Sequence, residues 1–304
     1  MGKIIRVLIM LIAMTGVMFA CDRQHYEVPK VEVVNVKESP DEVTVMSYNI
    51  RCMTTENWSV RVQLIGEGIA SVAPDLIGMQ EVTISRVRKL DQLDNLKEIV
   101  GDEYGCIAYG RDSGNKGEAC VIFYKKSRFE LLDEGVFWLS ETPDEVSRYS
   151  GAACNRTAAY AYLKDKVTGG ELVYYNTHLD HVSDEARIYG QQVIFDHMQT
   201  TFAADMPKIL TGDFNYSEGS DCYVTATTVM NDAKYLATTS DSGKTFHGYN
   251  GGIDGLPIDF CLLSKNVQKV RSYTILRTVR DGQYASDHYA IYVNLTLPVF
   301  ATAA

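Results

Sequence analysis

A polar segment that follows a short apolar run, Thr211–Asn215, carries residue types suited to hydrolytic chemistry. The apolar run, Lys208–Leu210, indicates a buried strand, and Gly212 allows the backbone to turn where that strand ends. Residues at positions i and i+2 of an extended chain point the same way, so Asp213 and Asn215 can converge on one small target. A carboxylate can orient or deprotonate a water molecule, and a carboxamide can donate to an anionic oxygen.

The same pattern, a strand-like run that ends in polar side chains, recurs along the chain. Aspartate and asparagine beside glycine are also ordinary turn residues, so one such segment would mean little. Its repetition favours a single shared site over unrelated turns. The other four segments are Ser47–Asn49, Met79–Glu81, Asn176–Asp180 and Ser286–His288.

Taken in order, these five segments resemble the endonuclease/exonuclease/phosphatase superfamily of metal-dependent phosphoesterases, over about residues 43–297. Its members include pancreatic-type DNases, abasic-site endonucleases, carbon catabolite repressor-type deadenylases, neutral sphingomyelinases and inositol polyphosphate 5-phosphatases. The resemblance implies a DNase-like α/β fold, a two-sheet β-sandwich flanked by helices in four layers. It also implies a site at one rim, where strand ends of both sheets converge.

The resemblance implies a metal site. Glu81 would be the principal ligand of Mg²⁺, with Mn²⁺ as a possible substitute, and Asp287 would serve the same ion. Asn49 would contact the metal or the phosphate. Mg²⁺ prefers a few carboxylates plus water molecules, which agrees with this set. Without the resemblance, each residue could equally be a solvated strand end or a turn residue.

The resemblance also places His178 and His288 beside the phosphate. A catalytic histidine needs an acceptor that fixes its tautomer and holds it cationic. We expect Asp259 to do this for His288, and Glu118 for His178. Without the family pattern, both acids would be taken for surface residues.

Three further residues are candidates for substrate contact. Arg111 and Arg156 lie in predicted loops, and an arginine can bind phosphate through two parallel hydrogen bonds. An ordinary surface position explains each of them nearly as well. His181 closely follows the segment that contains His178 and could touch substrate.

The reaction implied is hydrolysis of a phosphoester by in-line attack of water. Asp213 would orient or deprotonate the water, and Mg²⁺ on Glu81 would act as a Lewis acid. Asn215, His178 and His288 would stabilise the charge that develops on the phosphate. No nucleophilic side chain is required.

The charge balance bears on the substrate. The chain has 29 lysine and arginine residues against 39 acidic ones, and its longest basic run is the pair Lys125-Lys126. Nucleases gain much of their affinity by neutralising successive phosphates, so we predict a small-molecule or lipid-linked phosphoester as substrate. Aromatic and small residues such as Phe246, Tyr249 and Gly251 suit such a group. An extracellular nuclease is the alternative, and a catalytically inactive surface-binding protein ranks last because every expected ligand is present.

The N-terminus resembles a bacterial lipoprotein signal. Lys3 and Arg6 precede an apolar run, Val7–Phe19, that is short for a membrane span, and Ala20-Cys21 follows. We expect residues 1–20 to be a signal peptide, 21–42 a tether and 43–304 the catalytic domain. Lipid on Cys21 would anchor an exported protein to a bacterial membrane, on its periplasmic or cell-surface side. An ordinary secretory signal or an uncleaved anchor are the other interpretations.

The remaining cysteines are widely spaced and form no CxxC pair, so most are expected to be buried thiols, with their disulfide state left open. They are Cys52, Cys106, Cys120, Cys154, Cys222 and Cys261.

Strands and helices alternate without an internal linker, which favours one domain, and we expect a monomer. Helices are predicted from Asn57 to Val72, across Ile84–Leu93, and from Ser183 to about Phe202.

Overall fold

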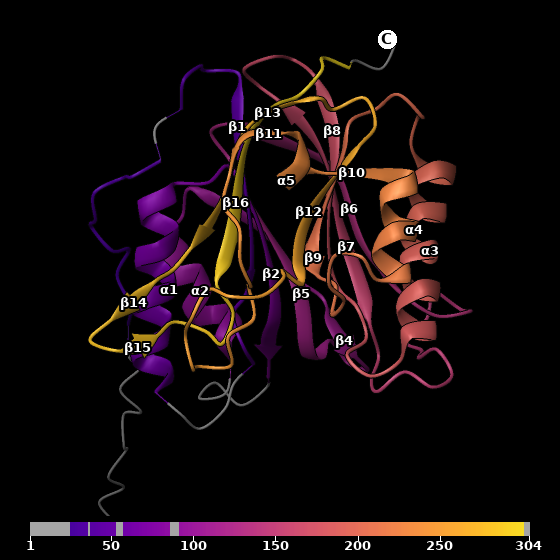
Figure 1. Ribbon diagram of the computed structural model, residues 1–304, viewed down its shortest axis with the longest axis horizontal. Coiled ribbons are helices and arrows are strands. Elements are labelled where there is room, and N and C mark those ends of the chain that lie inside the picture. Colours follow the sequence, from indigo (N-terminus) through magenta and orange to yellow (C-terminus); the bar gives the residue numbers. More distant parts are fainter. Residues whose placement is uncertain (1–24, 36, 53–56, 86–90, 301–304) are drawn as a thin grey trace, which may run out of the picture.

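The computed structural model describes residues 25–35, 37–52, 57–85 and 91–300, and two β-sheets face each other at its centre. Helices α1 and α2 cover the outer face of one sheet, and α3 and α4 that of the other (Figure 1). Apolar side chains fill all three interfaces between these layers. The four-layer α/β sandwich expected from the sequence is therefore confirmed.

The first sheet has eight strands among the described residues, in the order β11-β13-β16-β1-β2-β5-β3, with β4 paired to β5. β1 and β2 run parallel, so their carboxyl ends lie at the same edge. The strands are β1 (Glu42–Asn49), β2 (Leu76–Ile84), β3 (Tyr104–Ile107), β4 (Gly110–Asp112), β5 (Lys116–Lys125), β11 (Ala237–Ser240), β13 (Lys269–Leu276) and β16 (Ala290–Thr296).

The second sheet has six strands in the described part of the chain, in the order β10-β12-β9-β8-β7-β6. β8 and β9 are parallel, and Asp213 at the end of β9 pairs with Asp259 at the start of β12. The strands are β6 (Phe129–Trp138), β7 (Thr157–Asp165), β8 (Glu171–His178), β9 (Lys208–Asp213), β10 (Met230–Asp232) and β12 (Asp259–Ser264). A separate hairpin joins β14 (Val279–Arg280) to β15 (Gln283–Tyr284).

The helices lie where the sequence predicts them, but not all of their ends agree with the prediction. Ser183 caps α3 by accepting from the Ala186 N–H at 3.1 Å, as predicted. Asn57 precedes α1 in a left-handed conformation and makes no side-chain cap. No helix in these ranges is both long and apolar enough to cross a membrane. The helices are α1 (Trp58–Val72), α2 (Gln92–Val100), α3 (Asp184–Thr201), α4 (Asp221–Val229) and the short α5 (Ala233–Leu236).

The helix predicted across Ile84–Leu93 is wrong at its start. Ile84 is the last residue of β2, and Asp91 caps α2 by accepting from the Asp94 N–H at 3.3 Å. Val87 and Leu90, which fall inside that predicted helix, lie outside the described residues. A short apolar run can form either a helix or a strand, and here its first residue, Ile84, belongs to β2.

The segment predicted as a tether packs against the domain over its described part, which begins at His25. Tyr26 N–H donates to Glu98 at 3.2 Å, and Val34 N–H donates to the carbonyl of Ser71 in α1 at 2.8 Å. The side chain of Asn35 donates to Thr44 at 3.1 Å. The described residues of the segment expected to be a tether are thus mostly exposed, but several of them are hydrogen-bonded to the domain surface.

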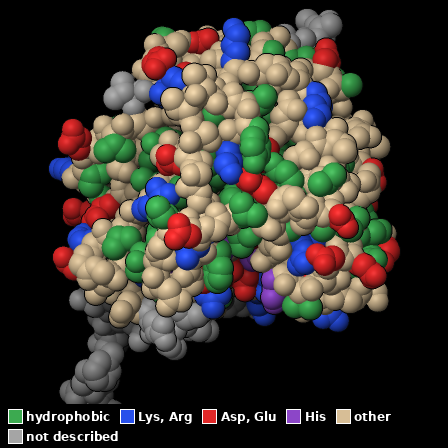
Figure 2. Space-filling model, viewed as in Figure 1, with side chains coloured by type: hydrophobic (Ala, Val, Ile, Leu, Met, Phe, Trp, Pro, Cys, Tyr) green, Lys and Arg blue, Asp and Glu red, His purple; other side chains and the backbone are tan. Residues whose placement is uncertain are grey.

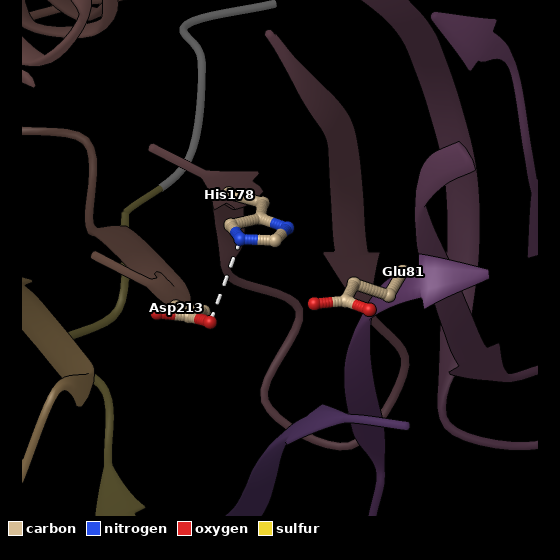
Figure 3. Close-up of side chains that lie close together, drawn as sticks. All are labelled: Glu81, His178 and Asp213. Carbon is tan, nitrogen blue, oxygen red and sulfur yellow. Dashed lines mark ion pairs between the residues drawn. The ribbon is translucent and has the colours of Figure 1, made fainter. Parts of the chain in front are cut away.

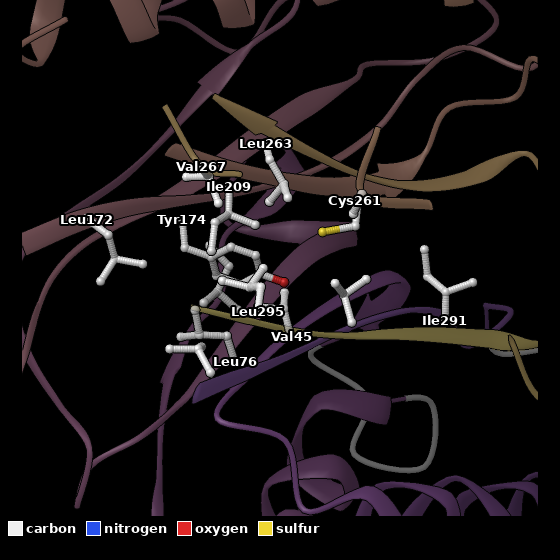
Figure 4. Packing of buried hydrophobic residues seen from close by; sticks show 14 of the residues in the cluster. Val45, Leu76, Leu172, Tyr174, Ile209, Cys261, Leu263, Val267, Ile291 and Leu295 are labelled. Atoms are coloured by element: carbon white, nitrogen blue, oxygen red, sulfur yellow. The ribbon is translucent and has the colours of Figure 1, made fainter. Parts of the chain in front are cut away.

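The interface between the two sheets combines apolar packing with a buried polar network. Figure 4 shows Val45, Leu76, Ile209 and Leu263 meeting between the sheets. The polar network includes the hydroxyl of Tyr174, which lies 2.7 Å from Thr211 Oγ1. It also includes Gln80, whose Nε2 donates to Asn176 Oδ1 at 2.6 Å. The bond from Gln80 joins β2 of the first sheet to β8 of the second, and the bond between Tyr174 and Thr211 joins β8 to β9.

We expect Gly78→Ala to destabilise the protein, because a Cβ atom there would lie 2.5 Å from Thr211 Oγ1 and 2.6 Å from both Asn176 Oδ1 and the Tyr174 hydroxyl. Overpacking of a filled core typically costs about 1–3 kcal/mol. Urea unfolding should show this loss, whereas Gly170→Ala, whose Cβ would stay at least 3.4 Å from its neighbours, should unfold like the wild type. Equal stability of the two variants would contradict the tight contact between the sheets.

Candidate active site

The polar strand ends of both sheets meet at one rim of the sandwich. β1 and β2 bring Asn49 and Glu81 from the first sheet, and β8 and β9 bring His178 and Asp213 from the second. Asp259 opens β12 next to Asp213. The segment Ser286–His288 enters the same rim just before β16. The convergence expected from the sequence is therefore present.

A bulge aims Glu81 into the rim. The register between β2 and β5 shifts between Met79 and Val82, and Glu81 has a positive φ of 60°. The sequence predicted a strand that ended at Glu81, whereas β2 continues to Ile84. A bulge re-aims one side chain while the strand goes on, and a non-glycine residue at positive φ is maintained where the surrounding structure requires it. Such residues gather at functional sites.

Hydrogen bonds hold the carboxylate of Glu81 in its ionised form. Oε2 accepts from Cys52 N–H at 2.9 Å, and Oε1 accepts from Asn49 Nδ2 at 3.1 Å. Burial alone would raise the pKa of Glu81, but these two bonds and the nearby charge of Arg51 hold that pKa below its usual value. Glu81 therefore presents a fixed negative charge at the rim.

Asp213 lies beside His178, and Glu81 lies across from both (Figure 3). The Oδ2 atom of Asp213 accepts from Asn49 Nδ2 at 2.8 Å and lies 3.5 Å from His178 Nε2 and 3.7 Å from His288 Nε2. Burial and the charge of Asp259 raise the pKa of Asp213 to about 7, although His288 and the hydrogen bond from Asn49 oppose this shift. A carboxylate with such a pKa is suited to accept a proton near neutral pH.

His288 is held between two carboxylates. Its Nδ1 lies 2.9 Å from Asp259 Oδ2, the pairing expected from the sequence, and its Nε2 faces Asp213. Burial alone would lower the pKa of His288, but the charges of Asp259 and Asp213 raise it to about 10. The ring is therefore an imidazolium that can stabilise negative charge at the rim.

We expect Asp259→Asn to lower turnover by about 10–100-fold without unfolding the protein, because His288 loses the acceptor that orients its ring and stabilises its charge. The measurement is kcat together with the melting temperature. Asp254→Asn, in an exposed loop, is the matched control and should leave both unchanged. A wild-type rate in Asp259→Asn would show that the pair with His288 has no part in the reaction.

The prediction that Glu118 orients His178 is wrong. Arg111, on the neighbouring strand β4, binds both carboxylate oxygens of Glu118, at 2.9 and 3.1 Å. The prediction of a cationic His178 is also wrong. Burial and the charge of Arg156 lower the pKa of His178 well below its usual value, so the ring is neutral. Two arginines that sequence reasoning treated as separate loop residues thus change the chemistry of both groups.

The two asparagines also differ from expectation. Asn49 is fully buried, and its Nδ2 bridges the carboxylates of Glu81 and Asp213 instead of facing open space. β9 ends at Asp213, and Asn215 has a left-handed φ of 52°, so the argument from an extended chain fails. Its Nδ2 donates to the carbonyl of Leu179 at 3.0 Å. Asn49 thus positions the acids, and the amide nitrogen of Asn215 is already bonded.

A cavity of about 330 Å³ lies at this rim. Sequence reasoning missed Arg51, which lies 3.7 Å from Glu81 and 3.6 Å from Asp287, although it stands only two residues after Asn49. It also missed the thiols of Cys52 and Cys154. The complete lining is Arg51, Cys52, Glu81, Arg111, Glu118, Cys154, Arg156, His178, His181, Asp213, Asn215, Phe246, Ile258, Asp287 and His288.

The acidic side chains of this cavity fit a divalent cation. Glu81, His178 and Asp213 each offer a ligand atom within 4.8 Å of the others. Asp213, Asp259 and His288 form a second such group, but Asp259 and His288 are already paired with each other. The carboxylate of Asp287 lines the same cavity. Oxygen ligands of this kind suit Mg²⁺, and a neutral His178 can also ligate a metal.

Comparison with known proteins decides the family. The model of the Endonuclease/Exonuclease/phosphatase family matches residues 46–288. The chain belongs to this family. It is therefore a hydrolase of phosphoester bonds, in a family that depends on divalent metals.

Solved structures share the whole fold. A mannosyl-6-phosphatase of Bacteroides thetaiotaomicron is 30% identical, with a TM-score of 0.75 over 84% of this chain and 100% of that one. A family member from Bacteroides vulgatus is 33% identical, with a TM-score of 0.75 over 84% of this chain and 99% of that one. Both are thus similar to this chain over almost their full length.

Relatives found by sequence are more distant. Protein angel of Drosophila melanogaster is 27% identical over 164 residues, which are 52% of this chain and 44% of that protein. Nocturnin of the same species is 28% identical over 182 residues, 55% of this chain and 26% of that protein. The chain spans less than half the length of either relative.

Proposed function

We propose that this enzyme is a Mg²⁺-dependent phosphoesterase that hydrolyses a small-molecule or lipid-linked phosphoester by direct attack of water. The observation that carries the proposal is the position of Asp213. This buried carboxylate, whose pKa burial and Asp259 raise to about 7, lies between His178 and His288 in the cavity wall. That arrangement suits a group that takes a proton from water near neutral pH.

Water is the preferred nucleophile because the side chains that could replace it are unsuited. Burial raises the pKa of the Cys52 thiol to about 12 and also raises that of Cys154, so both are protonated at neutral pH. The hydroxyl of Ser286 donates to the carbonyl of Asn49 at 2.7 Å. Asp213 would orient the attacking water and accept its proton as the bond to phosphorus forms.

The remaining groups of the cavity would bind the phosphate and stabilise its charge. Arg111 and Arg156 line the cavity and can donate to phosphate oxygens, and the imidazolium of His288 faces the same space. Glu81 and Asp287 would hold Mg²⁺, which when bound supplies Lewis-acid stabilisation of the phosphate and the leaving oxygen. Asn49 would keep the carboxylates of Glu81 and Asp213 in register.

A small substrate is favoured by the size of the cavity and by the surface charge. A cavity of about 330 Å³ is at the small end of the range for ligand pockets. On the side of the sandwich that Figure 2 shows, lysine and arginine are scattered among acidic side chains, without a continuous basic stripe. The similarity to a mannosyl-6-phosphatase makes a sugar phosphate the first compound to test.

A nuclease is the second candidate, since some relatives found by sequence are named as exoribonuclease subunits of the CCR4-Not complex. The excess of acidic residues argues against binding a polymer of phosphates.

We further propose that the enzyme is a monomer, exported and anchored to a bacterial membrane through lipid on Cys21.

The test is ester hydrolysis by the chain from Asp22 onward, which keeps the segment that packs on α1, measured as inorganic phosphate for monoesters and as separated cleavage products for diesters and nucleic acids. Sugar phosphates, phospholipids, and single- and double-stranded nucleic acids are compared at physiological salt, with Mg²⁺ or with EDTA. We expect Mg²⁺-dependent hydrolysis that is fastest with a small or lipid phosphoester. Preferential cleavage of a polynucleotide, falling steeply with added salt, would promote the nuclease instead.

A further inference from the structure

His181 lines the cavity but lies outside the cluster around Asp213. It is exposed, and it follows β8 by three residues, in the loop that leads to α3. His178 and His288, in contrast, are buried and face Asp213. His181 therefore lies at the mouth of the cavity, where the part of a substrate beyond the phosphate would be.

The tautomer of His181 follows from its partner. Arg156 Nη2 lies 2.8 Å from His181 Nδ1. A guanidinium group has only donors, so Nδ1 must accept this hydrogen bond and cannot carry a proton. A neutral ring with an unprotonated Nδ1 carries its proton on Nε2. His181 thus presents an N–H donor at Nε2 for as long as Arg156 holds the other nitrogen.

The loop that carries His181 is fixed by the buried carboxylate of Asp180. Its Oδ1 accepts from the N–H groups of Val182 and Ser183 at 2.9 and 3.0 Å, and its Oδ2 accepts from Ala153 N–H at 2.9 Å. Arg187 donates to the carbonyl of Asp180 at 2.7 Å. The donor at Nε2 is therefore part of a preorganised loop, the condition under which one hydrogen bond contributes to specificity.

The cavity also has an apolar part. Phe246 and Ile258 line it, and the ring centroid of Phe246 lies 5.0 Å from that of His288. Phe246 remains 48% exposed, so part of its ring is open for contact. A leaving group that meets both this ring and the donor of His181 needs an apolar face as well as oxygen acceptors. A sugar ring, with C–H faces and hydroxyl groups, has both.

We propose that His181, oriented by Arg156, is a specificity residue that donates from Nε2 to a hydroxyl oxygen of a sugar leaving group, with Phe246 against the ring. The inference rests on the proposed function and deepens it by naming the substrate as a sugar phosphate. His181 transfers no proton in this role. Its loss should weaken recognition of the sugar and leave the reaction at phosphorus unchanged.

The test compares mannose 6-phosphate with p-nitrophenyl phosphate, which has no hydroxyl group on its leaving group. A hydrogen bond is worth about 0.5–1.5 kcal/mol, so we expect His181→Ala to lower kcat/KM for mannose 6-phosphate by roughly 2–12-fold. The value for p-nitrophenyl phosphate should stay within about twofold. His181→Gln should restore most of the loss, because its amide N–H can reach the position of Nε2. His25→Ala, whose side chain is 76% exposed, is the control.

A binding measurement separates failure of this inference from failure of the proposed function. Calorimetry should show that the wild type binds mannose 6-phosphate several-fold more tightly than inorganic phosphate, and that His181→Ala loses this difference while its phosphate affinity stays the same. That result would support the inference even if neither ester were hydrolysed. Equal losses with both esters, no loss with either, or no preference for the sugar phosphate in the wild type would each overturn it.

Discussion

Replacing Glu81 with glutamine is expected to lower turnover by roughly 10²–10⁴-fold, because Lewis-acid stabilisation contributes several kcal/mol and each 1.4 kcal/mol or so is tenfold in rate. The substitution keeps the shape of the side chain but removes the fixed negative charge that the bulge in β2 aims into the cavity. It also places an amide group where Oε1 and Oε2 now accept hydrogen bonds from Asn49 and Cys52.

The measurement is kcat as a function of Mg²⁺ concentration, with Mg²⁺ affinity from calorimetry. Asn49→Ala should lose less activity and less affinity, since Asn49 contributes only a dipole and a bridge between carboxylates. Glu130→Gln, at an exposed position of β6, should behave like the wild type. A Glu81→Gln protein with unchanged Mg²⁺ affinity would remove Glu81 from the metal site.

Asp213→Asn is the second change with a large expected effect. A positioned general base contributes typically ~10²–10⁴ in rate, and asparagine cannot accept the proton of the attacking water. The same change removes the negative charge that, with Asp259, raises the pKa of His288. We therefore expect a loss of roughly 10²–10⁴ in kcat, with a smaller change in KM.

Two comparisons make the Asp213 result interpretable. Asp205→Asn changes an exposed aspartate before β9 and should leave kcat unchanged. Circular dichroism should show Asp213→Asn folded, because Asn49, Asn215 and both histidines can still surround an isosteric amide. A folded variant with the wild-type rate would assign proton transfer to another group.

The convergence of the site could be predicted because each part is local in sequence. An apolar, strand-like run followed by polar residues indicates where the strand ends, and the carboxyl ends of parallel strands in one sheet lie at the same edge. The positions of strand ends depend on backbone direction, which local patterns encode well. The pair His288–Asp259, in contrast, was predicted from the family resemblance, since without it Asp259 would be taken for a surface acid.

The errors concern properties that several distant residues set together. Glu118 bonds to Arg111 because β4 and β5 form a tight pair, which the sequence does not display. His178 is neutral because it is buried beside the charge of Arg156. The combined effect of burial and a distant charge cannot be read from a sequence motif. The left-handed backbone at Glu81 could not be predicted either, since a glutamate side chain does not favour positive φ.

The most direct test of the central claim is phosphate release from a sugar phosphate by the wild type and by Glu81→Gln, each with Mg²⁺ and with EDTA. We predict rapid release by the wild type with Mg²⁺, loss of that activity in EDTA with recovery when Mg²⁺ is restored, and little release by Glu81→Gln in either condition. Full wild-type activity in EDTA, or equal rates for the two proteins, would contradict a phosphoesterase that works through a metal ion held by Glu81.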